Sequence, residues 1–423
     1  MRIPPALRSL PGDGRALFAT RVVRLFAYGF LSVVLVLYLV AAGLSEARVG
    51  LLLTLTLLGD TTISLLLTTR ADRWGRRRTL LVGAALMLLA GVTFALTHSY
   101  ALLLVAATVG VISPSGNEVG PFLAVEQAAL TEVVPARERT NVFAWYGLAG
   151  SFATAAGSLA GGGLSQAVQD AGATPLASYR AVVVGYAAAG IALAVLFSRL
   201  SRAVETTTVQ AAGIGGRFGL HRSRGVVFRL AGLFSLDAFA GGFVVQAIVA
   251  YWFHLRFGAQ PALLGGIFFG ANLLAGCSAL AAAWVARRIG LVNTMVFTHL
   301  PSNVLLLLVP LMPTLPLAIA VLFLRFSISQ MDVPTRQSYT MAMVEPDERS
   351  AAAGVTGVAR TTGAALSPAI ATPLLASPAL MGLPFFLAGG LKIVYDLLLW
   401  RGFRSLTPPE ERGESTGSRR PVS

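Results

Sequence analysis

The sequence predicts an all-α polytopic membrane protein, with twelve transmembrane helices in two pseudo-symmetric six-helix bundles. Its 423 residues are 55% hydrophobic and only 12% charged, whereas a soluble protein carries about 25% charged residues. The apolar residues gather in blocks of about 20, the length with which a helix crosses a bilayer core of roughly 30 Å. This composition argues against a water-soluble enzyme.

The apolar blocks define the expected spans one by one. The first block, Leu25 to Leu44, is too long for a signal-peptide core and is expected to remain as span one. The later blocks are separated by short polar or arginine-containing segments. In order, we expect spans one to twelve at residues 22–43, 49–69, 79–97, 101–127, 140–163, 180–199, 227–253, 263–285, 292–312, 315–335, 351–375 and 382–400.

The basic residues predict the orientation. Most of the 33 Lys and Arg residues fall in the tails and in the loops of one side; Arg48, Arg180 and Arg256 fall on the other side. The positive-inside rule therefore places both termini in the cytoplasm of a multi-pass protein of the inner (plasma) membrane. The net charge of +14 is expected to bind anionic lipid headgroups. Nucleic acid is not expected as a partner, because no basic stripe alternates with aromatic residues.

The spans divide six and six around one long cytoplasmic connection. Glu138-Arg139-Thr140 and Glu348-Arg349-Ser350 open spans five and eleven at an offset of 210 residues, which indicates related halves. The expected parts are a cytoplasmic tail (1–21), an N-terminal bundle (22–199), a flexible linker (200–226), a C-terminal bundle (227–402) and a disordered cytoplasmic tail (403–423).

The loop after span two carries a charged motif, Asp72-Arg73-Trp74-Gly75-Arg76-Arg77-Arg78. It resembles the G-x-x-x-D-R-x-G-R-R signature of the major facilitator superfamily, with Thr68 in place of the first glycine. In the second half, residues 286–290 form a degenerate copy without the acid. We expect Asp72 to accept hydrogen bonds from helix-start amides and from nearby arginines, and so to close a cytoplasmic gate with Arg73, Gly75 and Arg76.

Span five carries a glycine motif, Gly157-Ser158-Leu159-Ala160-Gly161-Gly162. It is similar to the G-P-x-x-G-G antiporter motif of the same superfamily, with serine in place of proline. The resemblance covers about residues 20 to 402. It implies alternating access between two bundles, with spans one, four, seven and ten around a central cavity. It also places Glu118, Asp237 and Arg325 beside that cavity.

Ten ionisable side chains fall inside the expected spans, where each costs on the order of 3 kcal/mol or more and therefore invites a functional role. The first half contributes three acids and no base. In the second half Asp332 and Arg336 are expected to pair, as are Lys392 and Asp396, since each pair is one helical turn apart. Span four surrounds its acid with two prolines and two glycines. The ten are Asp60, Glu118, Glu126, Asp237, Arg325, Asp332, Arg336, Arg360, Lys392 and Asp396.

A gradient-driven transporter of a small organic solute is the function these features favour. No phosphate-binding loop, catalytic motif or metal-ligand spacing occurs, and Cys277 is the single cysteine, so neither an enzyme nor a cofactor or metal is expected. Asp60, Glu118 or Asp237 would carry a proton. Arg325 or Arg360 would recognise the substrate or gate that acid, and Gln246 is a candidate lining residue of the substrate pocket. Proton-coupled efflux by a monomer is the leading hypothesis. Uptake of an organic metabolite, anions included, by symport or uniport is the alternative, and a non-transporting receptor or scaffold is the third.

Overall fold

A computed structural model describes residues 10–135, 138–205 and 220–404, and in these ranges the chain forms helices and no strand. The all-α prediction is therefore confirmed. The expected flexible linker and disordered tail fall largely on residues 206–219 and 405–423, which lie outside the described residues.

Seven helical segments of the described chain are individually long and apolar enough to cross a membrane, and a bent pair provides an eighth. The bent pair is α2 (Gly12–Ser32) with α3 (Leu35–Ala41), which meet at 45°. The others are α4 (Glu46–Thr68), α6 (Arg76–Leu96), α10 (Pro175–Ser198), α11 (Arg224–Gly242) continued by α12 (Gln246–Phe257), α13 (Pro261–Ile289), α14 (Leu291–Leu308) with its 3-10 extension, and α19 (Leu383–Phe403).

The remaining four expected spans are interrupted or rich in small residues. Span five is α9 (Arg139–Asp170), a continuous helix of 32 residues that contains the glycine motif. Spans four, ten and eleven are each divided in two: α7 (Tyr100–Val109) and α8 (Phe122–Val133), α15 (Leu315–Phe326) and α16 (Asp332–Ala342), and α17 (Arg349–Leu366) and α18 (Pro368–Leu374). Short helices α5 (Ala71–Trp74), Arg202–Val204 and Pro346–Glu348 lie in the connections.

Spans one, four, seven and ten are all broken, and they are the spans that the family resemblance places around a central cavity. The break in span four is the longest. The sequence predicts a helical span over 101–127 that contains two prolines and two glycines, but residues 110–121 leave the helix altogether. Gly116 and Gly120 have φ angles of +72° and +79°, which a side chain disfavours, and Pro114 and Pro121 cannot donate helical hydrogen bonds. Unwound backbone at membrane depth is typical of ligand or ion sites.

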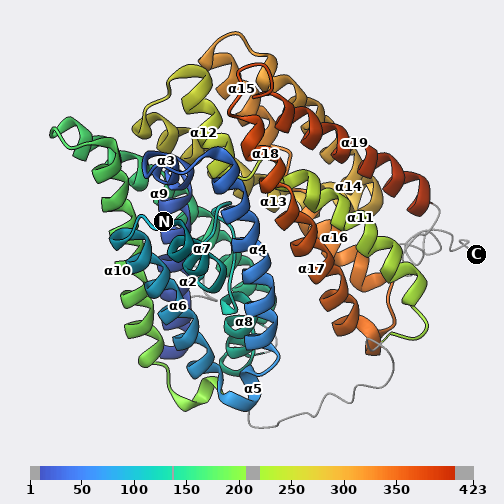
Figure 1. The fold of residues 1–423 in the computed structure, drawn as a ribbon. Coiled ribbons are helices and arrows are strands. Elements are labelled where there is room, and N and C mark those ends of the chain that lie inside the picture. The colour runs from blue at the N-terminus through green and yellow to red at the C-terminus, as the bar shows by residue number, and fades with distance from the viewer. Residues whose placement is uncertain (1–9, 136–137, 206–219, 405–423) are drawn as a thin grey trace, which may run out of the picture. The chain divides into compact units, whose positions relative to one another are not determined.

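The chain folds into two contact units. Unit 1 comprises residues 1–211, 245–273 and 368–381, and unit 2 comprises 212–244, 274–367 and 382–423. In unit 1, α2 packs along α9 and α10, α10 packs along α6, and α4 contacts α7 and α18 (Figure 1). In unit 2, α11 packs along α17 and α19, while α14 contacts α19 and α16.

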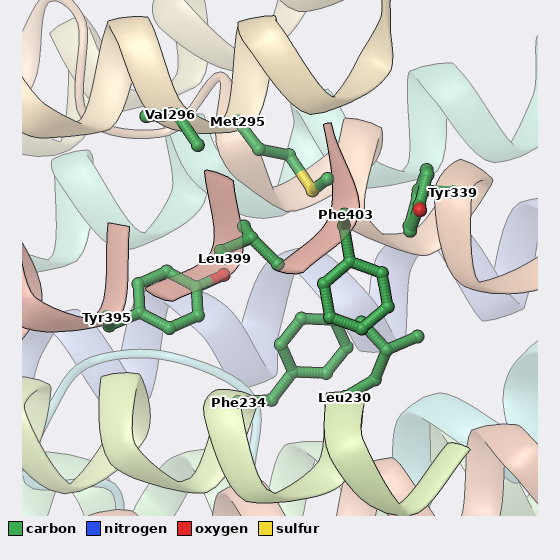
Figure 2. Close-up of a cluster of buried hydrophobic side chains, with 8 residues drawn as sticks. All are labelled: Leu230, Phe234, Met295, Val296, Tyr339, Tyr395, Leu399 and Phe403. Atoms are coloured by element: carbon green, nitrogen blue, oxygen red, sulfur yellow. The ribbon is translucent and has the colours of Figure 1, made fainter. Parts of the chain in front are cut away.

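One hydrophobic cluster of unit 2 consists of aromatic and aliphatic side chains from α11, α14, α16 and α19. Figure 2 shows the rings of Phe234, Tyr395 and Phe403 converging between the facing helices. The whole cluster consists of Leu230, Phe234, Met295, Val296, Tyr339, Tyr395, Leu399 and Phe403. This apolar packing holds in register the helices that carry the charged groups described below.

Candidate functional site

A buried ion-pair cluster joins the first, fourth and fifth spans within unit 1. Arg24 on α2 is 0% exposed, and its two terminal nitrogens each lie 2.6 Å from one oxygen of Glu126. Arg24 also contacts Glu118 at 3.2 Å, and Arg21 forms a second ion pair with Glu118. Tyr146 of α9 donates to Glu126. Bidentate guanidinium–carboxylate pairs are among the strongest charge-assisted contacts.

The expectation that the first half holds no buried base is wrong. Arg21 was expected in the tail and Arg24 at the very edge of span one, but α2 begins at Gly12, so both arginines lie inside the helix and are buried. A span that is predicted from a run of apolar residues stops at the first charged residue, even where the helix continues. The signal that could have found these two arginines is their spacing of one helical turn on the face that continues the apolar helix.

Asp60 on α4 differs from the other first-half acids because it makes no ion pair with any described residue. It accepts a hydrogen bond of 2.5 Å from the backbone N–H of Gly120, in the unwound part of span four, and one of 3.3 Å from Ser64. Its side chain is half-buried. The structure thus brings a spare carboxyl group to the break in span four.

A second charged network lies in unit 2, where Asp237 of α11 receives three basic partners. Lys392 lies 2.5 Å away, Arg336 2.9 Å and the ring of His299 3.8 Å. Arg336 also reaches Asp332 at 3.4 Å, as expected from their spacing on the chain. All of these side chains are at least nine-tenths buried.

The expected pair of Lys392 with Asp396 is wrong. Lys392 binds Asp237 instead, while Asp396 contacts His299 of α14 at 2.8 Å and accepts a hydrogen bond from Asn303, also at 2.8 Å. Residues one turn apart can pair, but a partner on a neighbouring helix competes when both are buried. His299 is a functional candidate that the sequence reasoning missed, since a lone histidine carries no signal.

Arg325 and Arg360 have no ion pair or hydrogen-bond partner among the described residues. The Nε atoms of both are buried and unsatisfied. Arg325, at the end of α15, lies over the ring of Phe326 at 4.8 Å. Ser329, in the break of span ten, also has a buried hydroxyl without a partner. Unit 2 therefore contains two basic groups without an ion-pair partner among the described residues, whereas unit 1 contains one such acid, Asp60. These groups are called spare below.

Gln246 is part of a polar cluster within unit 1. Its amide nitrogen donates to Ser32 at 2.8 Å and to Ser158 at 3.1 Å, and its oxygen accepts from Asn272 at 3.0 Å. The backbone N–H of Ala247 donates to the carbonyl of Pro114 at 3.0 Å. These bonds tie α12 and α13 to spans one, four and five, and they occupy the Gln246 amide that was expected to contact substrate.

The glycine motif of α9 forms close helix contacts. A Cβ atom at Gly157 or Gly161 would collide with the backbone of Phe26 or Phe30 on α2, and one at Gly162 would collide with Pro261 and Gly265 of α13. Small residues four apart allow such close approach between membrane helices.

The charged loop after span two is held by a carboxylate that the sequence reasoning missed. Glu205 accepts from the backbone N–H groups of Arg76 and Arg77 at 2.7 and 3.2 Å, so the expected role of Asp72 as the acceptor of helix-start amides is wrong. Asp72 instead accepts from Arg76 at 2.8 Å, and Arg76 reaches Glu132 of α8 at 3.2 Å. Arg73 is exposed, and Gly75 has φ +98° where the loop turns into α6.

A carboxylate also caps the start of α11 in unit 2. Glu348 accepts from the N–H groups of Arg222 and Ser223, both at 2.8 Å, and from that of His221. Burial alone would raise the pKa of Glu348, but the hydrogen bonds from Ser223, His221 and Arg222 outweigh it and lower the pKa to about 2. The carboxylate therefore stays ionised at physiological pH.

Comparison with known proteins gives consistent matches over nearly the whole chain. The model of the Major Facilitator Superfamily matches residues 17–368. The uncharacterised membrane protein YJR124C of Saccharomyces cerevisiae is 32% identical over 417 residues, which cover 92% of this chain and 93% of that protein. Two solved structures share the fold. The nucleoside transporter NupG has a TM-score of 0.70 at 14% identity, over 93% of this chain and all of that one. A D-xylose–proton symporter has a TM-score of 0.70 at 16% identity, over 92% and 97%.

Proposed function

Because the chain belongs to the Major Facilitator Superfamily and is thus a multi-pass membrane transporter, we propose that it exports a small organic solute in exchange for protons. Asp60 carries the proton in this proposal. The two bundles move by alternating access in an inner (plasma) membrane, with both termini cytoplasmic and with one chain as the working unit.

The observation that carries the proposal is the contrast among the three acids expected to bind protons. Glu118 is held by Arg21 and Arg24, and Asp237 by Lys392 and Arg336. An ion-paired carboxylate keeps its negative charge and does not readily take up a proton. Asp60 has no cationic partner among the described residues, and its acceptor contacts are hydrogen bonds to Gly120 and Ser64.

The position of Asp60 supports coupling to movement. Gly120 lies in the unwound segment of span four, residues 110–121. Protonation of Asp60 would weaken the hydrogen bond from the Gly120 N–H and so act directly on this non-helical segment. The export direction rests on the resemblance of the span-five motif to that of antiporters.

The test uses purified protein in proteoliposomes that contain a trapped pH-sensitive dye. Xylose, uridine, ethidium, succinate, benzenesulfonate and glucose 6-phosphate are added one at a time, and internal pH is followed. We expect at least one solute to move protons with the wild type and with Asp170→Asn, which changes an exposed acid at the end of α9. Asp60→Asn should abolish this proton movement while leaving solute exchange between equal concentrations. Proton movement that survives in Asp60→Asn contradicts the proposal.

Uptake is the second candidate, and the spare arginines of unit 2 favour it, since an anion can enter together with a proton. Accumulation of the solute found above in everted vesicles supports export, whereas accumulation in right-side-out vesicles supports uptake.

A further inference from the structure

Unit 2 contains more basic groups inside its expected spans than its acids can neutralise. Its three intramembrane carboxylates, Asp237, Asp332 and Asp396, all have partners, supplied by Lys392, Arg336, His299 and Asn303. Arg325 and Arg360 remain after this pairing.

Both spare arginines lie in one electrostatic neighbourhood. Arg360 is repelled by the neighbouring cation Arg336, and both Arg325 and Arg360 are attracted by the charges of Asp237 and Asp332 without forming an ion pair with them. Each has an Nε–H that is buried without an acceptor, and the adjacent break of span ten adds the unpartnered hydroxyl of Ser329. Buried donors are nearly always satisfied in native proteins, so several orphans in one region indicate a missing acceptor.

We infer that Arg325 and Arg360 bind the anionic group of the transported solute, a carboxylate, sulfonate or phosphate. This inference rests on the proposed transport function and specifies its substrate class. The planar guanidinium presents parallel N–H donors that match the oxygens of such anions, and it remains charged at any physiological pH. The Ser329 hydroxyl can donate a further hydrogen bond.

A structural role accounts for these arginines less well. A structural arginine inside a membrane bundle has a carboxylate or carbonyl partner, as Arg24 and Arg336 do. Arg325 and Arg360 are half-buried, with buried Nε atoms. A charge inside a membrane bundle without a counter-charge destabilises the fold, and a protein retains it where a ligand supplies that counter-charge. The helix end beside Arg325 and the ring of Phe326 give only partial compensation.

The test measures binding to the full-length purified protein in detergent by thermal shift. The probes are pairs of similar size that differ in charge: succinate and succinamide, benzenesulfonate and benzenesulfonamide, glucose 6-phosphate and glucose. We expect at least one acid to raise the melting temperature of the wild type while its neutral partner does not. Arg325→Gln and Arg360→Gln should each weaken that acid's binding at least about tenfold, or about 1.4 kcal/mol. Arg325→Lys should retain part of it, and Arg401→Gln, an exposed arginine on α19, all of it.

The same variants separate recognition from folding. Without ligand, Arg325→Gln and Arg360→Gln should melt at the wild-type temperature or above it, because each removes a half-buried charge that has no ion-pair partner among the described residues. Arg336→Gln, which breaks ion pairs, should melt lower. Equal binding of the neutral partners, no binding of any acid, or unchanged acid binding by either glutamine variant overturns the inference. Proton coupling through Asp60 is measured separately, so either proposal can fail while the other stands.

Discussion

Unit 1 and unit 2 each contain an ion-pair network and, beside it, charged groups without an ion-pair partner among the described residues. The unpaired group is acidic in unit 1 and the unpaired groups are basic in unit 2. In unit 1, the acids Glu118 and Glu126 are neutralised by Arg21 and Arg24, and the acid Asp60 is left over. In unit 2, every described intramembrane acid is paired and two arginines are left over. Each unit thus contains a closed ion-pair network beside unpaired groups. Under the two proposals made above, the acid left over in unit 1 binds the proton and the arginines left over in unit 2 bind the anion.

This comparison separates groups that hold the fold from groups that are free to bind. Removing one member of a closed network leaves a partner charge buried without compensation. Removing a spare group leaves no such charge. Stability measurements on single substitutions can therefore test the assignment even while the transported solute is unidentified.

The largest effect is expected from Arg24→Gln, which opens the unit 1 network. Glu126 loses its bidentate partner in a fully buried position, and breaking such a pair costs about 3–5 kcal/mol. Thermal unfolding in detergent should show a large loss of melting temperature, whereas Arg78→Gln, which changes an exposed side chain in the first turn of α6, should not. Equal stability of the two variants would mean that the network does not hold unit 1 together.

A smaller effect is expected at the helix contact that positions Arg24. Gly161→Ala places a methyl group against the backbone of Phe30, so α2 and α9 must separate, at a cost of about 1–3 kcal/mol. Gly163→Ala is the matched control, because nothing lies within 4 Å of its Cβ position. Melting temperatures should fall for Gly161→Ala and stay level or rise for Gly163→Ala.

The helix caps provide a pH-dependent comparison. Glu348→Gln should lower the melting temperature by a few degrees at pH 7, because the charged acceptor at the start of α11 is lost. The folded-state pKa lies below the ordinary value of 4.5, so the carboxylate stabilises the fold fully above about pH 4.5, and this contribution fades as pH falls toward about 2. The difference between wild type and Glu348→Gln should therefore narrow from pH 5 to pH 3. Glu345→Gln, on an exposed neighbour, should show no comparable difference at pH 7.

The smallest stability effect is expected for Asp60→Asn. The amide keeps an oxygen that can accept from Gly120 and removes a charge that has no cationic partner among the described residues. The free energy of unfolding should change by less than about 0.5 kcal/mol, or rise, as for substitutions outside closed networks, and thermal unfolding in detergent measures it. A large destabilisation would show that Asp60 belongs to the structural group of acids.

The sequence was sufficient for the fold and for the inventory of second-half charges. Apolar block length predicts the helices, and the cost of burying a charge marks ten ionisable residues, among them Asp60, Arg325 and Arg360. Only the structure separates these three from the ion-paired rest. The prolines and glycines around Glu118 predict a disturbed span four. These properties depend on composition within a single helix, which is visible along the chain.

Partnership between helices could not be predicted in the same way. Asp396 pairs with His299, 97 residues away, and Glu205 caps a helix that begins 129 residues earlier in the chain. Arg24 was missed because a charge at the edge of an apolar run resembles a residue at the membrane surface. Each of these contacts depends on which faces two helices turn toward one another. That orientation cannot be predicted from a single sequence without an alignment.

One contact in unit 1 has a consequence for mutagenesis. The bond from Ala247 to Pro114 uses only main-chain atoms, so ordinary side-chain replacements leave it in place. Alanine scanning would pass over it, and sequences could diverge widely around it without losing it. Ala247→Pro is the replacement that removes the donor N–H of this bond. The junction between the fourth and seventh spans therefore tolerates changes of side chain but not the loss of this backbone N–H.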